Sequence, residues 1–423
     1  MLRVGVPEDI GPDRARMFVS LKVRNFGLFL GGQIVSNVGT WMQRIAQDWL
    51  VYQLSGHDAV ALGVAVALQF TPTLVLSLWA GLLADRLPKR RLCSVIQCGI
   101  AVQALALGLL DVAGVVALWQ IYVLCVVLGC LSAVDVPARQ AFVAELVPPP
   151  LIANAVALNA TVFNLARAAG PALAGFAITM FGTGWMFIVN AGTTVVAIVS
   201  LLAVDARKLV CPVRVPRGRG QLRAGLAYVR ERPQLVRVMV IAFLVSTFSL
   251  TFSTSLTVMA GAVFRMGAGG YGILSTVLAV GTLLGALGTA RWLPRTEPAQ
   301  TRVLLLAALA VGAVEVGAAL LPTPAVFGAA LVPLGVATIT FLNTANSIVQ
   351  TTVEPGMRGR VMSLYVLVLI GGSPVGGPLA GWLADAWGGR APLVAGGLVA
   401  ALAAVGCRWL LHRRNTREFR YLA

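Results

Sequence analysis

A row of polar and charged side chains lies within the first long apolar segment of the chain. Its members are Gln33, Ser36, Asn37, Thr40, Gln43, Arg44, Gln47 and Asp48. At about 100° per residue they occupy roughly 140° of a helix, and the opposite face is apolar. Polar groups on a membrane-crossing helix are costly against lipid, so this face should line an aqueous cavity or another polar helix. Hydrogen bonding and proton exchange are the chemistry that these side chains offer.

Arg44 and Asp48 have the i, i+4 spacing that allows an ion pair on one helix face. Both lie toward the outer end of the segment, roughly 27 and 33 Å along the helix from its start. Two interpretations stay open. The pair belongs to a transport pathway, or it anchors the helix at the outer interface beside Trp41 and Trp49. The polar stripe continues deeper into the segment, which favours the pathway.

Proton coupling requires a group that changes its protonation within the membrane. The two histidines of the chain, His57 and His412, fall in an outer loop and in the C-terminal tail. Glu315, in ALAVGAVEVGAAL, is the most deeply placed carboxyl group, and Asp48 beside Arg44 is the alternative. We predict Glu315 and Asp48 as proton-coupling candidates. For Glu315 the competing interpretation is that it faces a neighbouring helix or lipid.

Further polar groups within expected spans complete a predicted substrate pathway. Arg167 lies deep in the fifth span, where a charge costs several kcal/mol unless it faces water or a partner. Asn343 and Asn346 supply neutral hydrogen-bonding groups in the tenth span. The pathway candidates are Gln33, Asn37, Thr40, Gln43, Arg44, Arg167, Asn343 and Asn346.

The composition defines the class of protein. Of 423 residues, 58% are hydrophobic and 12% charged, and soluble domains have roughly twice that charged fraction. Apolar runs long enough to cross a bilayer, about 20 residues each, recur throughout. We predict an all-α polytopic membrane protein with twelve transmembrane helices. The expected spans are residues 26–54, 60–83, 92–112, 117–136, 153–179, 186–204, 238–264, 270–290, 302–321, 325–349, 361–386 and 391–411.

The net charge of +17 is distributed on one side of the expected topology. Lys and Arg gather in the N-terminal tail, the second-to-third loop, the central loop and the C-terminal tail, whereas the alternate loops contain almost none. Basic residues accumulate on the cytoplasmic side, so both termini should be cytoplasmic. The basic excess therefore indicates topology, and no nucleic-acid partner is expected.

No cofactor or metal is expected. The six cysteines have no zinc-ligand spacing, and no nucleotide-binding sequence of the form G-x-x-x-x-G-K-[ST] is present. No cluster of a nucleophile with a base is apparent either, so an enzyme is not expected.

The chain divides into two similar halves around one long polar stretch. GPALAGFAITMFG from Gly170 resembles GGPLAGWLADAWG from Gly376, and DRLPKR from Asp85 resembles RWLPRT from Arg291, with the same displacement in both pairs. Two six-helix pseudo-repeats are an arrangement that secondary transporters use. The expected parts are a tail 1–25, a six-helix bundle 26–204, a central cytoplasmic loop 205–237, a second bundle 238–411 and a tail 412–423.

The segment GLLADRLPKRR, which ends the second span, resembles the G-x-x-x-D-R-x-G-R/K-R/K signature of the major facilitator superfamily, with Pro88 in place of the second glycine. The resemblance implies a cytoplasmic latch between this aspartate, the N-terminus of the eleventh helix and nearby arginines. The same charges also fit the positive-inside rule alone. DVPARQ adds an acid and a base, but Pro137 between them leaves a regular helical pair undecided. The expected gate is Gly81, Asp85, Arg86, Lys89, Arg90, Asp135, Arg139, Arg358 and Arg360.

ARAAGPALAG in the fifth span resembles the glycine–proline motif of antiporters in the same superfamily. Gly170, Pro171 and Gly175 carry this resemblance, and small residues there would let two helices approach closely. A packing seam without functional meaning is the alternative.

The resemblance extends over most of the chain, through GGQIVSNVGTWMQRIAQDWLVYQLSG, PARQAFVAELV, NAVALNATVFNLARAAGPALAG and RGRVMSLYVLVLIGGSPVGGPLAGWLAD. These segments are similar to the bacterial branch that includes the enterobactin exporter and the transmembrane secretion effectors of drug:proton antiporter type. The resemblance implies the major facilitator fold and proton-coupled efflux of a small amphipathic compound by alternating access. A drug, a siderophore or a secondary metabolite would fit.

Two alternatives stay open: a facilitator or importer of a small solute on the same fold, and a non-transporting scaffold or sensor. The latter is weaker because the chain shows no soluble domain beyond the central loop.

The expected partners are a small-molecule substrate, protons and the lipid bilayer. We expect a monomer in the inner (cytoplasmic) membrane of a bacterium.

Overall fold

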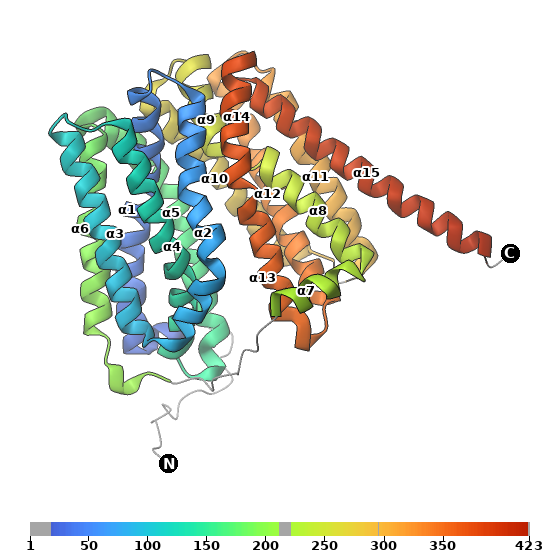
Figure 1. The fold of residues 1–423 in the computed structure, drawn as a ribbon, viewed down its shortest axis with the longest axis horizontal. Helices are drawn as coiled ribbons and strands as arrows, with labels where there is room; N and C mark the ends of the chain where they lie inside the picture. The colour runs from blue at the N-terminus through green and yellow to red at the C-terminus, as the bar shows by residue number, and fades with distance from the viewer. Residues whose placement is uncertain (1–17, 211–220, 295, 422–423) are drawn as a thin grey trace. The chain divides into compact units, whose positions relative to one another are not determined.

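The computed structural model describes residues 18–210, 221–294 and 296–421, and these ranges contain helices but no strands. The described chain packs as two compact units (Figure 1). Residues 18–47 and 75–210 form the first unit, and residues 48–74 and 221–421 form the second. Helices α1 and α2 therefore contribute to both units, whereas the sequence placed 26–204 in one bundle. That boundary stays a prediction.

Apart from the end of the fourth, the helices of the first part of the chain follow the expected spans closely. They are α1 (Arg24–Leu54), α2 (Ala59–Arg86), α3 (Lys89–Val112), α4 (Leu118–Leu146), α5 (Ile152–Phe181) and α6 (Thr183–Ala203). Within the first unit, α3 packs along α6 and also contacts α4.

The second unit contains the remaining helices. They are α7 (Gln221–Arg230), α8 (Pro233–Phe248), α9 (Phe252–Val258), a π-helical turn (Met259–Val263), α10 (Gly267–Trp292), α11 (Glu297–Ala319), α12 (Pro324–Thr352), α13 (Pro355–Gly371), α14 (Ser373–Trp387) and α15 (Ala391–Tyr421). In this unit α10 packs on α12, and α11 packs between α12 and α15.

Eleven segments of the described chain are long and apolar enough to cross a membrane. Helix α1 is not among them, although it is continuous over 31 residues, because the polar stripe lowers its hydropathy. The twelfth span therefore stays a prediction.

The fourth expected span, 117–136, ended too early. Helix α4 continues through Pro137 to Leu146, because a proline is tolerated where neighbouring helices pack against it. Asp135 and Arg139 form an ion pair one helical turn apart. Part of the expected central loop, 205–237, is also helical, since it contains α7 and the start of α8. Two expected single spans are interrupted, at 249–251 between α8 and α9 and at Gly372 between α13 and α14.

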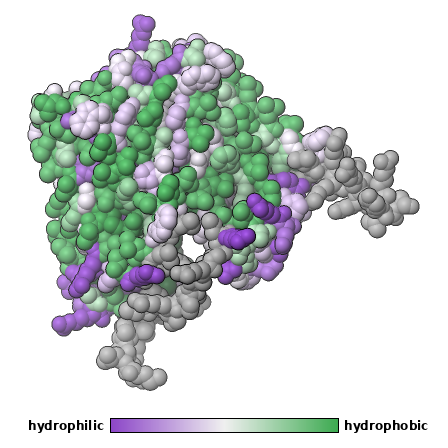
Figure 2. Space-filling model, viewed as in Figure 1, coloured by the Kyte–Doolittle hydropathy of each residue, from purple (hydrophilic) through white to green (hydrophobic). Residues whose placement is uncertain are grey.

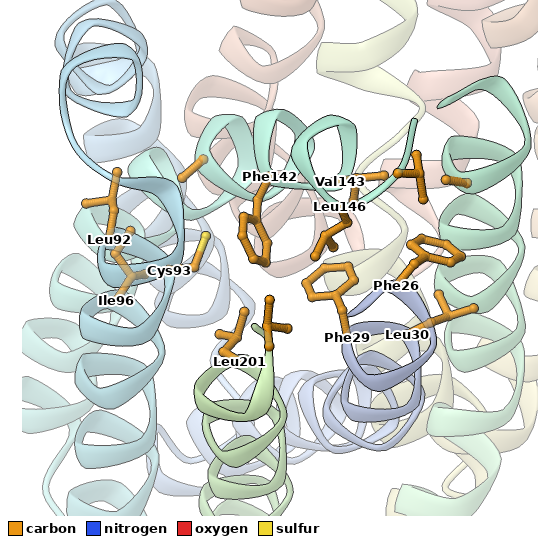
Figure 3. Close-up of a cluster of buried hydrophobic side chains, with 14 of the residues drawn as sticks. Phe26, Phe29, Leu30, Leu92, Cys93, Ile96, Phe142, Val143, Leu146 and Leu201 are labelled. Atoms are coloured by element: carbon orange, nitrogen blue, oxygen red, sulfur yellow. The ribbon is translucent and has the colours of Figure 1, made fainter. Parts of the chain in front are cut away.

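Aromatic and aliphatic side chains from five helices, α1, α3, α4, α5 and α6, form the core at one end of the first unit (Figure 3). Phe29 of α1 meets Phe142 of α4 edge-on, with ring centroids 5.6 Å apart. Leu92 of α3 and Leu201 of α6 close the same cluster. Helices in a membrane associate through such close van der Waals packing, so this cluster fixes α1 against α4 beside the polar residues described below.

The outer faces of many helices are apolar. Val95, Val102 and Leu109 recur every seven residues on α3 and are 70%, 67% and 55% exposed. In Figure 2, hydrophobic residues cover most of the helix flanks in view and hydrophilic ones gather near helix ends. This pattern is that of helices whose surroundings are lipid.

Helices α11 and α15 cross closely through glycines. We expect Gly312→Ala to lower the free energy of unfolding by about 1–3 kcal/mol, since the added methyl overpacks the crossing. It would lie 2.9 Å from the Ala401 nitrogen and against the Gly397 carbonyl. The measurement is thermal unfolding of the detergent-solubilised protein.

Gly317 lies on the same helix, with nothing within 4 Å of an added methyl. Gly317→Ala should therefore be neutral or stabilising by up to about 1 kcal/mol, and equal losses in both variants would contradict this account.

Candidate functional site

Most of the polar stripe of α1 faces protein in the structure, although Thr40 is exposed. Gln33, Asn37 and Gln43 are 1%, 6% and 3% exposed, whereas Ile34 and Val35 on the other face are 48% and 39% exposed. The sequence left two alternatives for what this stripe faces, an aqueous cavity or another polar helix. The hydrogen-bond partners of its side chains distinguish between them.

Gln43 is held by amides from two other helices of the first unit. Its Nε2 donates to Gln103 Oε1 of α3 at 3.1 Å, and it accepts from Asn190 Nδ2 of α6 at 2.6 Å. For Gln43 the polar-helix alternative therefore applies. Gln103 and Asn190 are additional to the residues predicted for the site. The signal was available, since both are amides inside apolar spans.

Gln33 belongs to a second buried network nearer the start of α1. It accepts from Arg139 Nη1 at 2.9 Å, and Arg139 Nη2 lies 2.7 Å from Asp135 Oδ2 on the same helix. Gln97 Nε2 of α3 donates to the other oxygen of Asp135 at 3.1 Å. Asp135 is 4% exposed, so this acid–base pair, whose geometry Pro137 left undecided, lies inside the first unit.

The basic residues after α2 bind within the first unit. Arg90 donates to the carbonyl oxygens of Leu201 and Leu202 at the end of α6, where a cation also compensates the helix dipole. Lys89 Nζ lies 3.3 Å from the Glu145 carboxylate of α4. Arg86 is exposed. Gly81 and Asp85 fall on α2, and their surroundings lie outside the part of the chain that the structure describes.

The expected partners before the eleventh span lie at the start of α13. Arg358 is exposed, and Arg360 contacts the Met357 sulfur at 3.3 Å. Beside them Arg232 pairs with Glu354 at 3.0 Å.

Asp48 lies in the second unit, where it is 4% exposed. Its Oδ2 accepts a hydrogen bond of 2.8 Å from the Tyr271 hydroxyl of α10, which is itself 1% exposed. Burial at this depth contradicts an anchor that snorkels to the interface through Asp48. Arg44 is partly exposed and its guanidinium lies 4.9 Å from the centre of the Trp41 ring.

Tyr271→Phe should lower the free energy of unfolding by about 1.5–3 kcal/mol, because a hydrogen bond to a carboxylate is lost while the carboxyl group stays buried. Thermal unfolding in detergent measures the effect. Tyr365→Phe is the matched control, since that hydroxyl donates to the Leu342 carbonyl over a longer 3.3 Å. A loss for Tyr271→Phe no larger than that of the control would contradict the assignment.

Glu315 is enclosed in the second unit and is 1% exposed. Its Oε2 has no hydrogen-bond partner among the described residues, and the Ser249 hydroxyl is a hydrogen-bonding neighbour of the carboxyl group. Of the alternative that Glu315 faces a neighbouring helix or lipid, the structure fits the neighbouring helix, because the side chain packs against the Gly396 and Gly397 backbone of α15. The role of Glu315 as a proton carrier stays a prediction.

The other pathway candidates lie on different helices. Thr40 donates within its own helix to the Ser36 carbonyl at 2.9 Å, and Asn343 of α12 donates to Thr289 of α10 at 2.8 Å. Asn346 accepts from Gln350 one turn along α12. Arg167 of α5 is partly exposed.

The glycine–proline motif lies within α5, which continues through Pro171. Gly170 and Gly175 are buried, and a methyl group at Gly170 would press on the Trp41 side chain of α1. This is the close helix approach that the motif predicted.

Comparison with solved structures identifies the class of protein. A bacterial homolog of the human lysosomal transporter Spinster superposes with a TM-score of 0.73 over 91% of this chain and 95% of its own, at 15% identity. The POT family transporter PepTSo superposes with a TM-score of 0.74 over 93% of this chain and 99% of its own, at 12% identity. The chain has the major facilitator fold.

Sequence comparison then gives the family. The model of the transmembrane secretion effector family matches residues 16–419, so the chain belongs to that family of major facilitator transporters. The family is one of transporters and not of enzymes.

The individual relatives share between 26% and 29% sequence identity with this chain. The multidrug efflux pump Tap of Mycolicibacterium fortuitum is 28% identical over 87% of this chain and 91% of its own length. The staphyloferrin A transporter of Staphylococcus aureus is 26% identical over 61% of this chain. The match spans 65% of that relative and 49% of the transporter YfiS of Bacillus subtilis.

Proposed function

We propose that this transporter exports a small amphipathic compound in exchange for protons. The compound belongs to the class of drugs, siderophores or secondary metabolites. The relatives named as a multidrug efflux pump and a siderophore transporter support the direction and the substrate class.

The observation that carries proton coupling is the enclosed carboxyl group of Glu315. An ionised carboxylate that is buried without a cation is far less stable than the neutral acid. A group in this setting binds a proton while it is enclosed and releases it when water reaches it. Asp48, hydrogen-bonded to Tyr271, is the second candidate.

The membrane orientation of the transporter and its cytoplasmic gate follow the predicted topology. Both termini are cytoplasmic, in the inner membrane of a bacterium, and the protein works as a monomer without nucleic acid. Gly81, Asp85, Arg86, Lys89 and Arg90, together with Asp135, Arg139, Arg358 and Arg360, form the cytoplasmic gate. Asn37, Asn343, Asn346 and Arg167 contact substrate during transport.

Transport by the purified protein tests this function. A drug-susceptibility screen of an overexpressing host, with metabolite profiling of a deletion strain, first selects the transported compound. Proteoliposomes loaded with that compound then receive an imposed pH gradient of either sign. Accumulation against its concentration gradient, reversed with the sign of the pH gradient, is expected. Movement that only follows the concentration gradient would identify a facilitator, and proton-driven uptake in the opposite orientation an importer.

A further inference from the structure

The interruption between α8 and α9 lies beside Glu315. Helix α8 ends at Phe248, and the chain resumes a helix at Phe252. The first residue of the interruption, Ser249, is 3% exposed. Its hydroxyl donates to the Gly396 carbonyl of α15 over 2.9 Å. Ser249 therefore connects the interruption to a helix that is 147 residues away in the sequence.

Glycines on α15 make this contact possible. A methyl group at Gly396 would lie 3.2 Å from Glu315 Oε2 and 2.5 Å from the Phe248 carbonyl oxygen. A methyl group at Gly397 would lie 3.0 Å from the Glu315 Cβ. The backbone of α15 thus approaches the carboxyl group and the end of α8 together.

The hydrogen bonds that the Ser249 hydroxyl can make depend on whether Glu315 is protonated. A serine hydroxyl has one proton, and here that proton is donated to Gly396. The hydroxyl oxygen keeps lone pairs that can accept a hydrogen bond from the neighbouring carboxyl group. A carboxylic acid has a proton to donate to it, whereas a carboxylate has none.

We propose that Ser249 is the positioning residue through which the protonation of Glu315 controls the interruption between α8 and α9. With Glu315 protonated, the acid donates to Ser249 and Ser249 donates to the Gly396 carbonyl, which joins α11, the interruption and α15. When Glu315 releases its proton, the hydroxyl turns to the carboxylate, and the Gly396 carbonyl loses its donor. This rests on the proposed proton coupling.

Other titratable groups lie on the packed elements. They include Glu297 and Arg302 of α11, Arg358, Arg360 and Tyr365 of α13, and Asp385 of α14. Arg390, just before α15, donates to the Ala319 carbonyl one turn beyond Glu315 on α11. Arg237 lies near the start of α8, roughly 18 Å along the helix axis from Ser249. Cys407 and Arg408 lie further along α15, and the sequence of α12 contains no titratable residue.

Infrared titration of the full-length protein in vesicles tests the link without any substrate. The difference between wild type and Glu315→Gln identifies the C=O band of protonated Glu315. In Ser249→Ala the band should move to higher frequency, because the acid loses its hydrogen-bond acceptor, and its titration midpoint should shift by about one pH unit. Ser249→Thr should restore both. Thr257→Val is the matched control, since that buried hydroxyl bonds only its own helix, at the Ser253 carbonyl, in the described contacts.

An unchanged band and midpoint in Ser249→Ala would overturn this inference even if proton-driven export is intact. Export without proton dependence in wild type would instead overturn the proposed function. Thermal unfolding of each variant confirms that the protein is folded, and Ser249→Thr keeps the test decisive if Ser249→Ala does not fold.

Discussion

Glu315→Gln is expected to reduce export driven by a pH gradient by at least about tenfold, or roughly 1.4 kcal/mol in activation free energy. The amide keeps the size of the side chain but binds no proton in the physiological range. Exchange of labelled substrate across vesicles without a gradient should stay within about twofold of wild type, because that reaction needs no net proton movement. The two assays together separate loss of coupling from loss of binding.

Glu297 provides the matched control for Glu315. It begins the same helix but is exposed, so Glu297→Gln should leave both assays unchanged. Glu315→Asp keeps a titratable group and should retain part of the gradient-driven export. If Glu315→Gln exports normally with an intact pH dependence, Glu315 is not the proton carrier, and Asp48→Asn becomes the next variant to measure.

Arg139→Ala is expected to destabilise the protein by about 3–5 kcal/mol, because it leaves the carboxylate of Asp135 buried without its cation. The two side chains are 23% and 6% exposed and lie 2.7 Å apart. The remaining described partner, Gln97, supplies one neutral hydrogen bond. The unfolding temperature in detergent should fall by roughly 10 °C.

The exposed pair of Arg232 with Glu354 is the control, since its side chains are 34% and 68% exposed. Arg232→Ala should cost no more than about 1 kcal/mol, because water screens such pairs. Asp135→Asn combined with Arg139→Gln should recover much of the loss, since no buried charge is left uncompensated. Equal effects of Arg139→Ala and Arg232→Ala would contradict the burial of the Asp135 pair.

Helix positions were largely predictable. A segment of about 20 apolar residues in a bilayer must satisfy its backbone hydrogen bonds internally, and a helix does so alone. For this reason α3, α6 and α12 begin and end within a few residues of their expected bounds. The error at α4 came from Pro137, which ends many helices in water but is tolerated where neighbouring helices pack against it.

Which polar groups meet was not predictable from local pattern. The stripe on α1 followed from helical periodicity, but its partners Gln103, Asn190 and Arg139 come from three other helices. Tyr271 is 223 residues from Asp48 in the sequence. Helical periodicity relates residues only a few turns apart, so it cannot predict such a contact unless the packing of the helices is already known.

The sequence by itself determined the class of membrane protein, the helix positions, the polar face of α1 and the carboxyl groups buried among apolar residues. These follow from hydropathy and periodicity, which act over a few turns of chain. Only the tertiary structure decided that Asp48 bonds Tyr271, that Glu315 lies beside an interrupted helix and that glycines bring α15 against both. The physical reason is that hydrogen bonds and close contacts are short-ranged, so they depend on which helix faces are packed together.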